Sequence, residues 1–553
     1  MLRALLTAVR GPAVCVGRCF SSEVSGAVST LTGFSSPPFS TEASLYVHWP
    51  YCLKRCSYCN NKYNPDTNPD PLLFTVTLLS EEMLLLITSV FFGGGTPSLA
   101  RPSTIAAVLE TVARHAGLSE EAEVTLEVNP TPVGSSKLED FLHAGVNHFS
   151  IGVQSLRDDD LKVLGRDHNS QHALQTVAEA RRLCPGRVSV DVMFGRPGQS
   201  VASWELELDE LLSVCDDHVS LYQLTLERGM SFLPNTDRFC ACYLDVGTGT
   251  DEMEEMEERT TGETVAGTPP LHHPQQTELT GTDEMEEMEE RTTGETVAGT
   301  PPLHHPKQTE LTGTDEMEER TTGETVAGTP PLHHPQQTEL TGTQLFRQVQ
   351  KGQLSVPSDD ITAVMYDSAR RILQKRGYLQ YEVSNFARNG AISQHNMSYW
   401  KASQYLGVGP GAHGRFVPRG EGDVCREART QTLEPDVWLR EVQQRSHGTR
   451  RRIPLTHLGL LEEVLVMGLR LIDGITHQHW QLFSPRADLY QILSSSSEVQ
   501  DLQQTGLLIL DDRGLRCSWQ GLALLDSMLP TLLLLLEAYI TQGLDNNSGS
   551  LQL

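Results

Sequence analysis

Residues 46–61 read YVHWPYCLKRCSYCNN, and this stretch places three thiols within eight positions. Cys52, Cys56 and Cys59 follow directly after an apolar run of β type, in a chain of 553 residues with only 11 cysteines. The lysine and arginine between them make the segment too polar for a buried core strand. The spacing Cys-x3-Cys-x2-Cys therefore predicts a set of metal ligands on a loop that leaves a strand.

Two kinds of metal site fit three clustered thiols. Cysteine thiolates are the usual ligands of iron–sulfur clusters, and three of them on a cubane leave one of its four irons open for a small molecule. A structural zinc site is the alternative, with His48 as its fourth ligand. We favour the iron–sulfur cluster, because zinc motifs normally take paired ligands from two separated places in the chain.

Six short apolar runs alternate with amphipathic, helix-like segments between residues 45 and 227. This alternation is typical of βαβ units and predicts a parallel sheet. Six such units predict an α/β fold, a partial (β/α)6 barrel of the TIM type. The predicted strands are Leu45–Trp49, Ser89–Phe92, Val124–Val128, Phe149–Val153, Val188–Phe194 and Val219–Leu226.

Polar residues and glycines follow almost every predicted strand. In a barrel of this kind the loops at the carboxyl ends of the strands form one rim, so these residues converge there. A run of three glycines, Gly93–Gly95, allows the backbone to approach a ligand closely. A plain tight turn is the alternative, and the lysine of a phosphate-binding loop is missing.

Two carboxylates, Glu127 and Asp191, would face the barrel interior, where an unpaired charge is costly. Hydroxyl groups or an ammonium group of a ligand would satisfy them, and Arg166 would bind a carboxylate with its planar fork. For each of these residues the alternative is a salt bridge that closes the barrel.

A series of motifs occurs in the order found in one known family. They are YVHWPYCLKRCSYC, FFGGGTPS, LEVNP, SIGVQS, LGRDH, VDVMFGRPGQ, YEVSNFA, HNMSYW and YLGVGPGAHG. In these motifs the chain resembles the radical S-adenosylmethionine superfamily, and within it the oxygen-independent coproporphyrinogen oxidases and the HemW-type heme chaperones. The resemblance covers most of residues 41 to 530 apart from an insert.

The resemblance implies which residues bind the cofactors. Cys52, Cys56 and Cys59 would hold a [4Fe-4S] cluster, and the amine and carboxylate of S-adenosylmethionine would chelate its open iron. The contacts to S-adenosylmethionine would come from Tyr46, Gly94, Gly95, Thr96, Glu127, Gln154, Arg166 and Asp191.

One departure from the oxidase pattern favours the chaperone branch. The oxidases carry a further cysteine two positions beyond the third cluster ligand, where this chain has Asn61. The resemblance then implies a protein that binds heme and delivers it to acceptor proteins. His395, expected in a polar loop, is the candidate axial ligand of the heme iron. A histidine bonded within that loop is the alternative, and an oxygen-independent coproporphyrinogen III oxidase-type radical enzyme is the rival function.

The first 22 residues contain Arg3, Arg10 and Arg18, and no acidic residue precedes Glu23. Small, hydroxyl-bearing and apolar residues separate these arginines. The pattern predicts a mitochondrial transit peptide with its linker over residues 1–40 and a location in the matrix. Thiols stay reduced in that compartment, so a disulfide framework is not expected.

An insert interrupts the family pattern. The sequence RTTGETVAGTPPLHHP begins at Arg259, Arg291 and Arg320, and its near-identity at every position indicates recent duplication rather than structural repeats. Without an aromatic residue, the tract is predicted to be disordered. Residues 251–343 hold 22 acidic and four basic side chains, so they carry −18 of the formal −28. The acidic remainder argues against nucleic-acid binding.

No apolar run is long enough to span a membrane. The chain between Cys59 and Gly93 is shorter than in relatives, so a product that cannot fold is a third possibility. The acceptor of heme and the oligomeric state stay open.

The domain boundaries follow from these segments. We expect a core barrel at 41–239, the insert at 240–343, the rest of the catalytic or heme-binding region at 344–450, a small C-terminal helical, winged-helix-like HemN domain at 451–530 and a tail at 531–553.

Overall fold

The structure is a computed structural model that describes residues 41–59, 85–225, 337–339, 343–418 and 425–548. The predicted transit peptide, the chain directly after Cys59 and nearly all of the repeat insert lie outside these residues. Predictions for those parts of the chain stay predictions.

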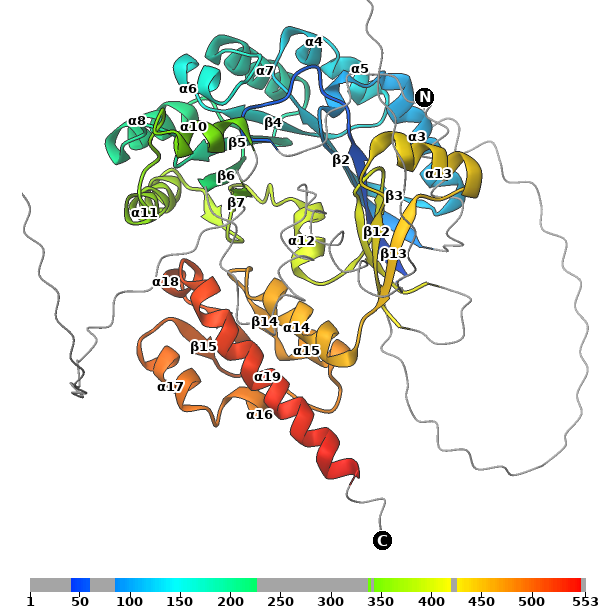
Figure 1. The fold of residues 1–553 in the computed structure, drawn as a ribbon, viewed down its shortest axis with the longest axis vertical. Coiled ribbons are helices and arrows are strands. Elements are labelled where there is room, and N and C mark those ends of the chain that lie inside the picture. The colour runs from blue at the N-terminus through cyan, green and yellow to red at the C-terminus, as the bar shows by residue number, and fades with distance from the viewer. Residues whose placement is uncertain (1–40, 60–84, 226–336, 340–342, 419–424, 549–553) are drawn as a thin grey trace, which may run out of the picture. The chain divides into compact units, whose positions relative to one another are not determined.

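One mixed sheet of 13 strands is the frame of the main body of the described protein (Figure 1). Its first six strands run parallel and are neighbours in sequence order, which confirms the predicted α/β fold. The strands are β1 Glu42–Trp49, β2 Leu86–Gly94, β3 Leu118–Val128, β4 His148–Gln154, β5 Val188–Phe194 and β6 His218–Thr225.

Helices cover the outer side of these strands (Figure 1). Apolar residues at helical spacing face the sheet, as in α3, where Ile105, Val108 and Val112 are buried. The covering helices are α3 Pro102–His115, α4 Pro132–Ser135, α5 Leu138–His143, α6 Asp158–Val163, α7 Ser170–Leu183, α8 Val201–Leu212 and α11 Asp359–Lys375. Helix α10 Gln344–Gln350 instead packs at the strand ends, where Leu345 N donates to Ser57 O at 2.9 Å.

The sheet extends beyond the six predicted strands at both ends. On one side β10 pairs in parallel with β1, and three further strands continue antiparallel. On the other side β6 pairs with β9, which pairs with β8. A short strand within the expected disordered insert, β7, also pairs with β6. These strands are β7 Gln337–Glu339, β8 Leu379–Gln380, β9 Asn385–Ala387, β10 Gln404–Val408, β11 His413–Phe416, β12 Glu427–Gln431 and β13 Thr449–Pro454.

The two faces of the parallel strands differ in polarity, because side chains alternate along a strand. One face supplies the apolar core toward the helices, for example Leu45 and Val47 of β1. The inner face is polar and hydrogen-bonded. Thr125 Oγ1 lies 2.9 Å from His148 Nδ1, and His148 Nε2 lies 3.1 Å from Ser189 Oγ. The polar face is therefore part of a built interior rather than an open surface.

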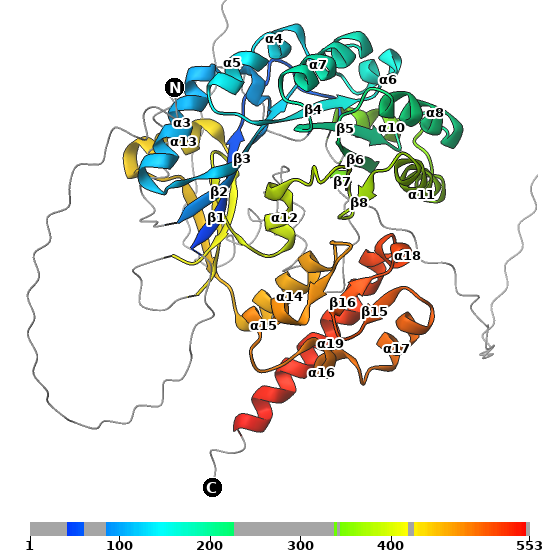
Figure 2. The ribbon, with the colours of Figure 1, turned by 180° about the vertical axis from the view of Figure 1, so that it is seen from behind.

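Helix α12, Gln394–Trp400, lies on this inner side of the sheet in both views (Figures 1 and 2). Its start is set by the Ser393 side chain, which accepts a hydrogen bond from the backbone N–H of Asn396. The backbone N–H groups of Gln394 and His395 donate to the Glu123 carboxylate of β3, each at 3.2 Å. Helix α12 is thus bonded into the polar face.

A second apolar core belongs to the C-terminal residues. Strands β15 and β16 form an antiparallel hairpin, whose turn includes Asp512 and Arg513. Among the residues that the structure describes, no helix is both long enough and apolar enough to cross a membrane. The remaining elements are α13 Pro435–Arg445, α14 His457–Gly468, β14 Ile475–Thr476, α15 His477–Phe483, α16 Leu489–Leu493, α17 Ser497–Gln504, β15 Leu508–Leu510, β16 Gly514–Cys517, α18 Trp519–Leu522 and α19 Leu525–Ser548.

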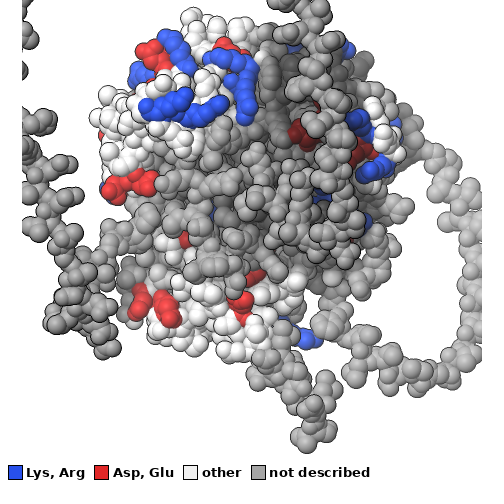
Figure 3. Space-filling view, viewed as in Figure 1, with Lys and Arg blue, Asp and Glu red and all other residues white. Residues whose placement is uncertain are grey.

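Charged side chains of both signs appear on the face drawn in Figure 3. Lysine and arginine gather in the upper part of the view, beside aspartate and glutamate. The described part of this face therefore does not carry a single sign of charge.

Candidate cofactor-binding site

The loop with the three cysteines leaves the carboxyl end of β1. Cys52, Cys56 and Cys59 are half-buried thiols. Two bonds anchor the middle of the loop: Ser57 N donates to Leu164 O at 3.0 Å, and Ser57 Oγ donates to Val163 O at 2.7 Å. The loop is therefore held against the end of α6, close to Arg166.

Polar donors surround two of the three sulfurs. Thr96 Oγ1 donates toward Cys52 Sγ at 3.4 Å, and Arg166 Nη1 donates toward Cys56 Sγ at 3.6 Å. Burial raises the pKa of Cys52, while the Thr96 hydroxyl opposes that shift. Hydrogen bonds to sulfur are one way in which a protein tunes an iron–sulfur cluster.

The glycine run packs against the strand that carries the cysteine loop. Gly95 N donates to Trp49 O at 2.6 Å, and a Cβ on Gly95 would lie 2.6 Å from the same oxygen. Gly94 has a φ of +101°, and a Cβ there would meet the His48 ring at 2.5 Å. Close contact between neighbouring strands therefore already requires glycine at both positions.

Arg166 joins the cysteine loop to two strand ends. Its Nη1 donates to the Tyr58 hydroxyl at 3.1 Å, and its Nη2 donates to Asn129 Oδ1 at 2.6 Å and to Gly152 O at 3.2 Å. Its Nε is buried and has no hydrogen-bond partner among the described residues. Tyr58 and Asn129 were not predicted as cofactor contacts, although both lie within the quoted motifs.

Two carboxylates lie on the inner face below the rim. Gly94 N donates to Glu127 Oε2 at 3.0 Å, and Ser150 Oγ donates to both carboxylate oxygens of Asp191, at 3.2 and 3.1 Å. Burial and the neighbouring Asp191 raise the pKa of Glu127 to about 8. Burial raises the pKa of Asp191 to about 6, against the hydrogen bonds of Ser220 and Ser150. Both groups therefore lack a fully compensating cation.

Gln154 ends β4 in an uncommon conformation. Its φ is +64°, and the pairing of β4 with β5 shifts register between Gly152 and Gln154. The side-chain Oε1 is buried, and nothing in the described part of the chain donates to it. Residues other than glycine reach this left-handed region mainly when the surrounding structure imposes it.

Tyr46 completes the set of expected contacts on β1. Its hydroxyl lies 3.1 Å from His48 Nδ1, and its ring stacks on Phe91 of β2 with 6.2 Å between the ring centroids. Burial, and after it the charge of Glu127, raises the pKa of Tyr46. The ring therefore stays neutral beside the two carboxylates.

His395 was expected in a polar loop, but it lies in helix α12, because Ser393 starts a helix there. Its side chain is only 1% exposed. Ser89 Oγ lies 2.9 Å from Nδ1, and Tyr399 OH lies 3.0 Å from Nε2, so both ring nitrogens are engaged. Burial lowers the pKa of His395 to about 3. This arrangement fits a histidine bonded within its surroundings, the alternative weighed against a heme ligand.

The donor set fits the two cofactors that the sequence suggests. Three thiols share one loop, while Arg166 Nε and Gln154 Oε1 offer one donor and one acceptor that the described residues leave unpaired. Among the residues described, no group of three or more histidine, cysteine, aspartate or glutamate side chains is placed to hold a single metal ion.

Comparisons with known proteins agree with this geometry. Residues 46–211 match the model of the radical SAM superfamily, and residues 455–524 match the HemN C-terminal domain. Radical S-adenosyl methionine domain-containing protein 1, mitochondrial, of Danio rerio is 52% identical over 94% of each chain. The chain belongs to this family. The Bos taurus and Mus musculus members are also named mitochondrial, which confirms the predicted mitochondrial location, while the matrix stays a prediction.

More distant relatives widen the comparison. The heme chaperone HemW of Bacillus subtilis is 24% identical to this chain, and the match covers 86% of this chain and 96% of HemW. Coproporphyrinogen III oxidase (HemN) of Escherichia coli, a radical SAM enzyme, has a TM-score of 0.57 at 14% identity, with 90% of this chain and 91% of that chain covered. At that identity the likeness concerns the fold alone.

Proposed function

We propose that this protein is a mitochondrial heme carrier that holds a [4Fe-4S] cluster and S-adenosylmethionine at the carboxyl ends of its parallel strands. One observation carries the proposal. Arg166 reaches from the loop after α6 toward Cys56 of the thiol loop and keeps a buried Nε without a partner among the described residues. A buried, unpaired guanidinium donor beside three thiols is expected where a ligand carboxylate completes the site.

Three side chains would hold the cluster. Cys52, Cys56 and Cys59 would each bind one iron and leave the fourth open. Thr96 and Arg166 would then donate to two of the thiolate sulfurs, stabilising their negative charge. With S-adenosylmethionine on the open iron, a reduced cluster supplies one-electron cleavage of the sulfonium.

The inner face would hold S-adenosylmethionine by complementary polar groups. Glu127 and Asp191 are acceptors for the ammonium group and the ribose hydroxyls, and a bound cation would lower the raised pKa of the nearer carboxyl group. Gln154 Oε1 is a further acceptor. Tyr46 and Phe91 offer stacked aromatic rings beside them.

Heme binding is proposed from the HemW relatives and from Asn61, which stands where the oxidases carry a cysteine. We assign the axial bond to a residue other than His395. Iron on either ring nitrogen would displace a hydrogen bond to Ser89 or Tyr399 inside the barrel. His395 instead fixes α12 against β2.

Anaerobic reconstitution with iron and sulfide tests the cofactor site. We expect about four irons per chain, as for one cubane, and a change in the EPR spectrum of the reduced cluster when S-adenosylmethionine is added. Uptake of zinc at the same loop, or an EPR spectrum that S-adenosylmethionine leaves unchanged, would contradict the proposal.

Heme titration separates the carrier from the enzyme. We expect a Soret band on addition of heme, with the same position in wild type and in a folded His395→Ala variant. A shifted Soret band in that variant would show that His395 is the axial ligand of the heme iron. Consumption of S-adenosylmethionine in step with porphyrin formed from a porphyrinogen would favour the oxidase instead.

A further inference from the structure

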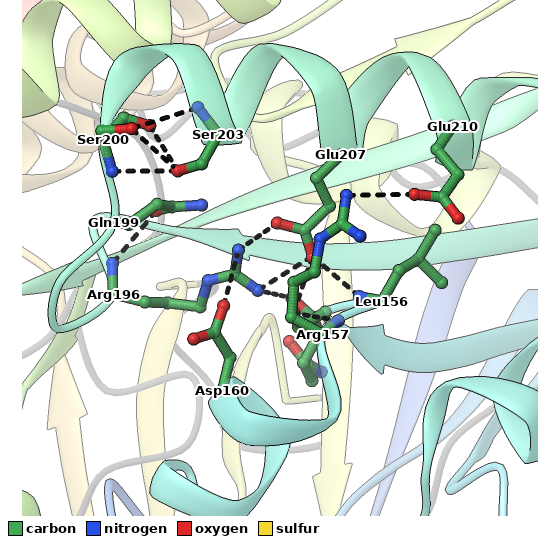
Figure 4. A network of polar contacts seen from close by, with 11 residues as sticks. Leu156, Arg157, Asp160, Arg196, Gln199, Ser200, Ser203, Glu207 and Glu210 are labelled. Carbon is green, nitrogen blue, oxygen red and sulfur yellow. Dashed lines mark hydrogen bonds and ion pairs between the residues drawn. The ribbon is translucent and has the colours of Figure 1, made fainter.

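Behind the site, a buried ion pair joins the ends of β4 and β5. Arg196 follows β5 and Glu207 lies on α8, and their side chains are only 1% and 2% exposed. The guanidinium Nη2 pairs with Glu207 Oε2 and lies 3.3 Å from Asp160 Oδ2 on α6 (Figure 4). Nη1 also donates to Glu207 Oε1 at 3.2 Å.

The Glu207 carboxylate holds the turn that follows Gln154. Its Oε1 accepts from the Ser155 hydroxyl at 2.6 Å and from the Leu156 backbone N–H at 2.7 Å (Figure 4). Arg196 Nη1 in addition donates to the Gln154 carbonyl at 3.4 Å. The carbonyl of Gln154 and both of the next two residues are therefore bonded to one ion pair.

This arrangement accounts for the conformation of Gln154. The residue has a φ of +64° at a register shift of β4, a region that residues other than glycine seldom occupy without support. The support comes from the helix side of the sheet, while Gln154 Oε1 lies buried without a partner in the described part of the chain. Arg166 donates to the Gly152 carbonyl and Arg196 donates to the Gln154 carbonyl, so the two arginines hold the same end of β4.

We propose that Arg196 and Glu207 are positioning residues for S-adenosylmethionine: they hold the turn 154–156 so that the Gln154 amide faces the cofactor. The inference rests on the proposed function, because it takes S-adenosylmethionine as the ligand. Neither residue touches the ligand. Their effect passes through the backbone of Gln154.

An exposed ion pair on the same turn provides a matched control. Arg157 Nη2 lies 3.1 Å from Glu210 Oε2, one helical turn beyond Glu207, with the two side chains 49% and 52% exposed. Solvent and salt screen such a pair, so its loss changes little. Glu210→Gln therefore removes one charge from the same helix without disturbing Gln154.

The first test measures binding of S-adenosylmethionine to the reconstituted full chain, by anaerobic calorimetry and by the EPR change of the reduced cluster. Glu207→Gln keeps the side-chain shape but presents donors to Arg196, so we expect affinity to fall about tenfold with unchanged iron content. Glu210→Gln should stay within about twofold of wild type. Equal affinity of wild type and Glu207→Gln would overturn the inference.

A second variant separates positioning from stability. Replacing both partners, Arg196→Met with Glu207→Met, removes the buried charges together and should preserve the fold. Because no unpaired charge is left buried, we expect the thermal stability of this double variant to exceed that of Glu207→Gln. Ser155 and Leu156 still lose their acceptor, so binding of S-adenosylmethionine should stay weak. Recovery of binding together with stability would show a merely structural pair and would also overturn the inference.

A double-mutant cycle tests whether the effect passes through Gln154. In a Gln154→Ala background, Glu207→Gln should add less than a twofold loss of affinity. A full tenfold loss in that background would place the action of Glu207 elsewhere. Wild-type protein that takes up iron but fails to bind S-adenosylmethionine would instead refute the proposed function, which the variants alone do not.

Discussion

The inner face of the barrel has two ends that treat polar side chains differently. At the base, near the start of the strands, His148 and His395 each have both ring nitrogens engaged. At the mouth, near the strand ends, Gln154 Oε1 and Arg166 Nε are buried without partners among the described residues. His148 and His395 therefore serve packing at the base, while we propose that the unpaired groups at the mouth serve recognition of a ligand.

The difference teaches how to separate structural from functional polar residues when both are buried. A group whose bonds are complete adds rigidity, and its loss costs stability. A group whose bonds are incomplete costs stability itself and is expected where a ligand completes it. The predictions below test this division.

The largest effect is expected at the thiol loop. Cys56→Ala removes one of the three proposed cluster ligands, so iron and sulfide uptake should fall to near zero after anaerobic reconstitution. Cys425→Ala changes an exposed cysteine and should leave uptake unchanged. Retention of a full cluster by Cys56→Ala would contradict the proposal that the mouth is a cofactor site.

Next comes the guanidinium of the mouth. Arg166→Lys keeps the charge but loses the planar fork that reaches Tyr58, Asn129 and Cys56. We expect binding of S-adenosylmethionine to weaken by roughly 2 kcal/mol, about thirtyfold, as for hydrogen bonds to charged groups. Calorimetry on the reconstituted protein measures this.

The control is Arg182→Lys, which alters an exposed pair with Glu179 on α7. We expect no measurable change in binding, since such pairs contribute little. If both lysine variants bind like wild type, Arg166 belongs with the structural residues of the base.

Two serines give a matched comparison of base and mouth. Ser89→Ala leaves His395 Nδ1 buried without its partner, so the free energy of unfolding should fall by about 1–3 kcal/mol, without a change in binding of S-adenosylmethionine. Ser150→Ala acts on Asp191 and should alter binding more than stability. Denaturant unfolding and calorimetry on both variants measure the two quantities, and the reverse pattern would contradict the division.

The last prediction concerns the pH dependence of the cofactor-free protein. Because the pKa of folded Glu127 is raised to about 8 from the ordinary 4.5, the folded state binds more protons than the unfolded state between these values. This group's stabilising contribution is complete below pH 4.5 and is lost as pH rises through about 8. Thermal unfolding across this range should show a flatter profile for Glu127→Gln than for wild type.

An exposed glutamate on the same strand provides the control for this measurement. Glu120→Gln should follow the wild-type profile, because its side chain is exposed at the other end of β3. Parallel profiles for wild type and Glu127→Gln would show that Glu127 is paired more fully than the structure indicates.

The sequence predicts the parts of the fold that depend on local pattern. All six strand runs reappear as β1–β6, because apolar alternation and short length are local signals. The link from β10 back to β1 was not predicted, because Val47 and Val408 pair across 361 positions of sequence. Nothing within either segment identifies its partner.

The site shows the same limit. The three cysteines are proposed from their spacing, Glu127 and Asp191 from their places on β3 and β5, and Arg166 from its place in the loop after α6. The expected loop around His395 is a helix, which the N-cap serine at position 393 could have indicated. The roles of Arg196 and Glu207 depend on contacts between a loop and a distant face of α8, and their charges alone suggest exposed residues.

The pairing of β10 with β1 also bears on how the chain is built after entry into an organelle. A polypeptide imported from its N-terminus delivers β1 early, but the second neighbour of that strand arrives only with residues 404–408. Until then one edge of the strand that leads into the thiol loop lacks this partner, and exposed edges promote aggregation. Under the proposed function, we expect cluster insertion to follow complete import, when the edge is covered.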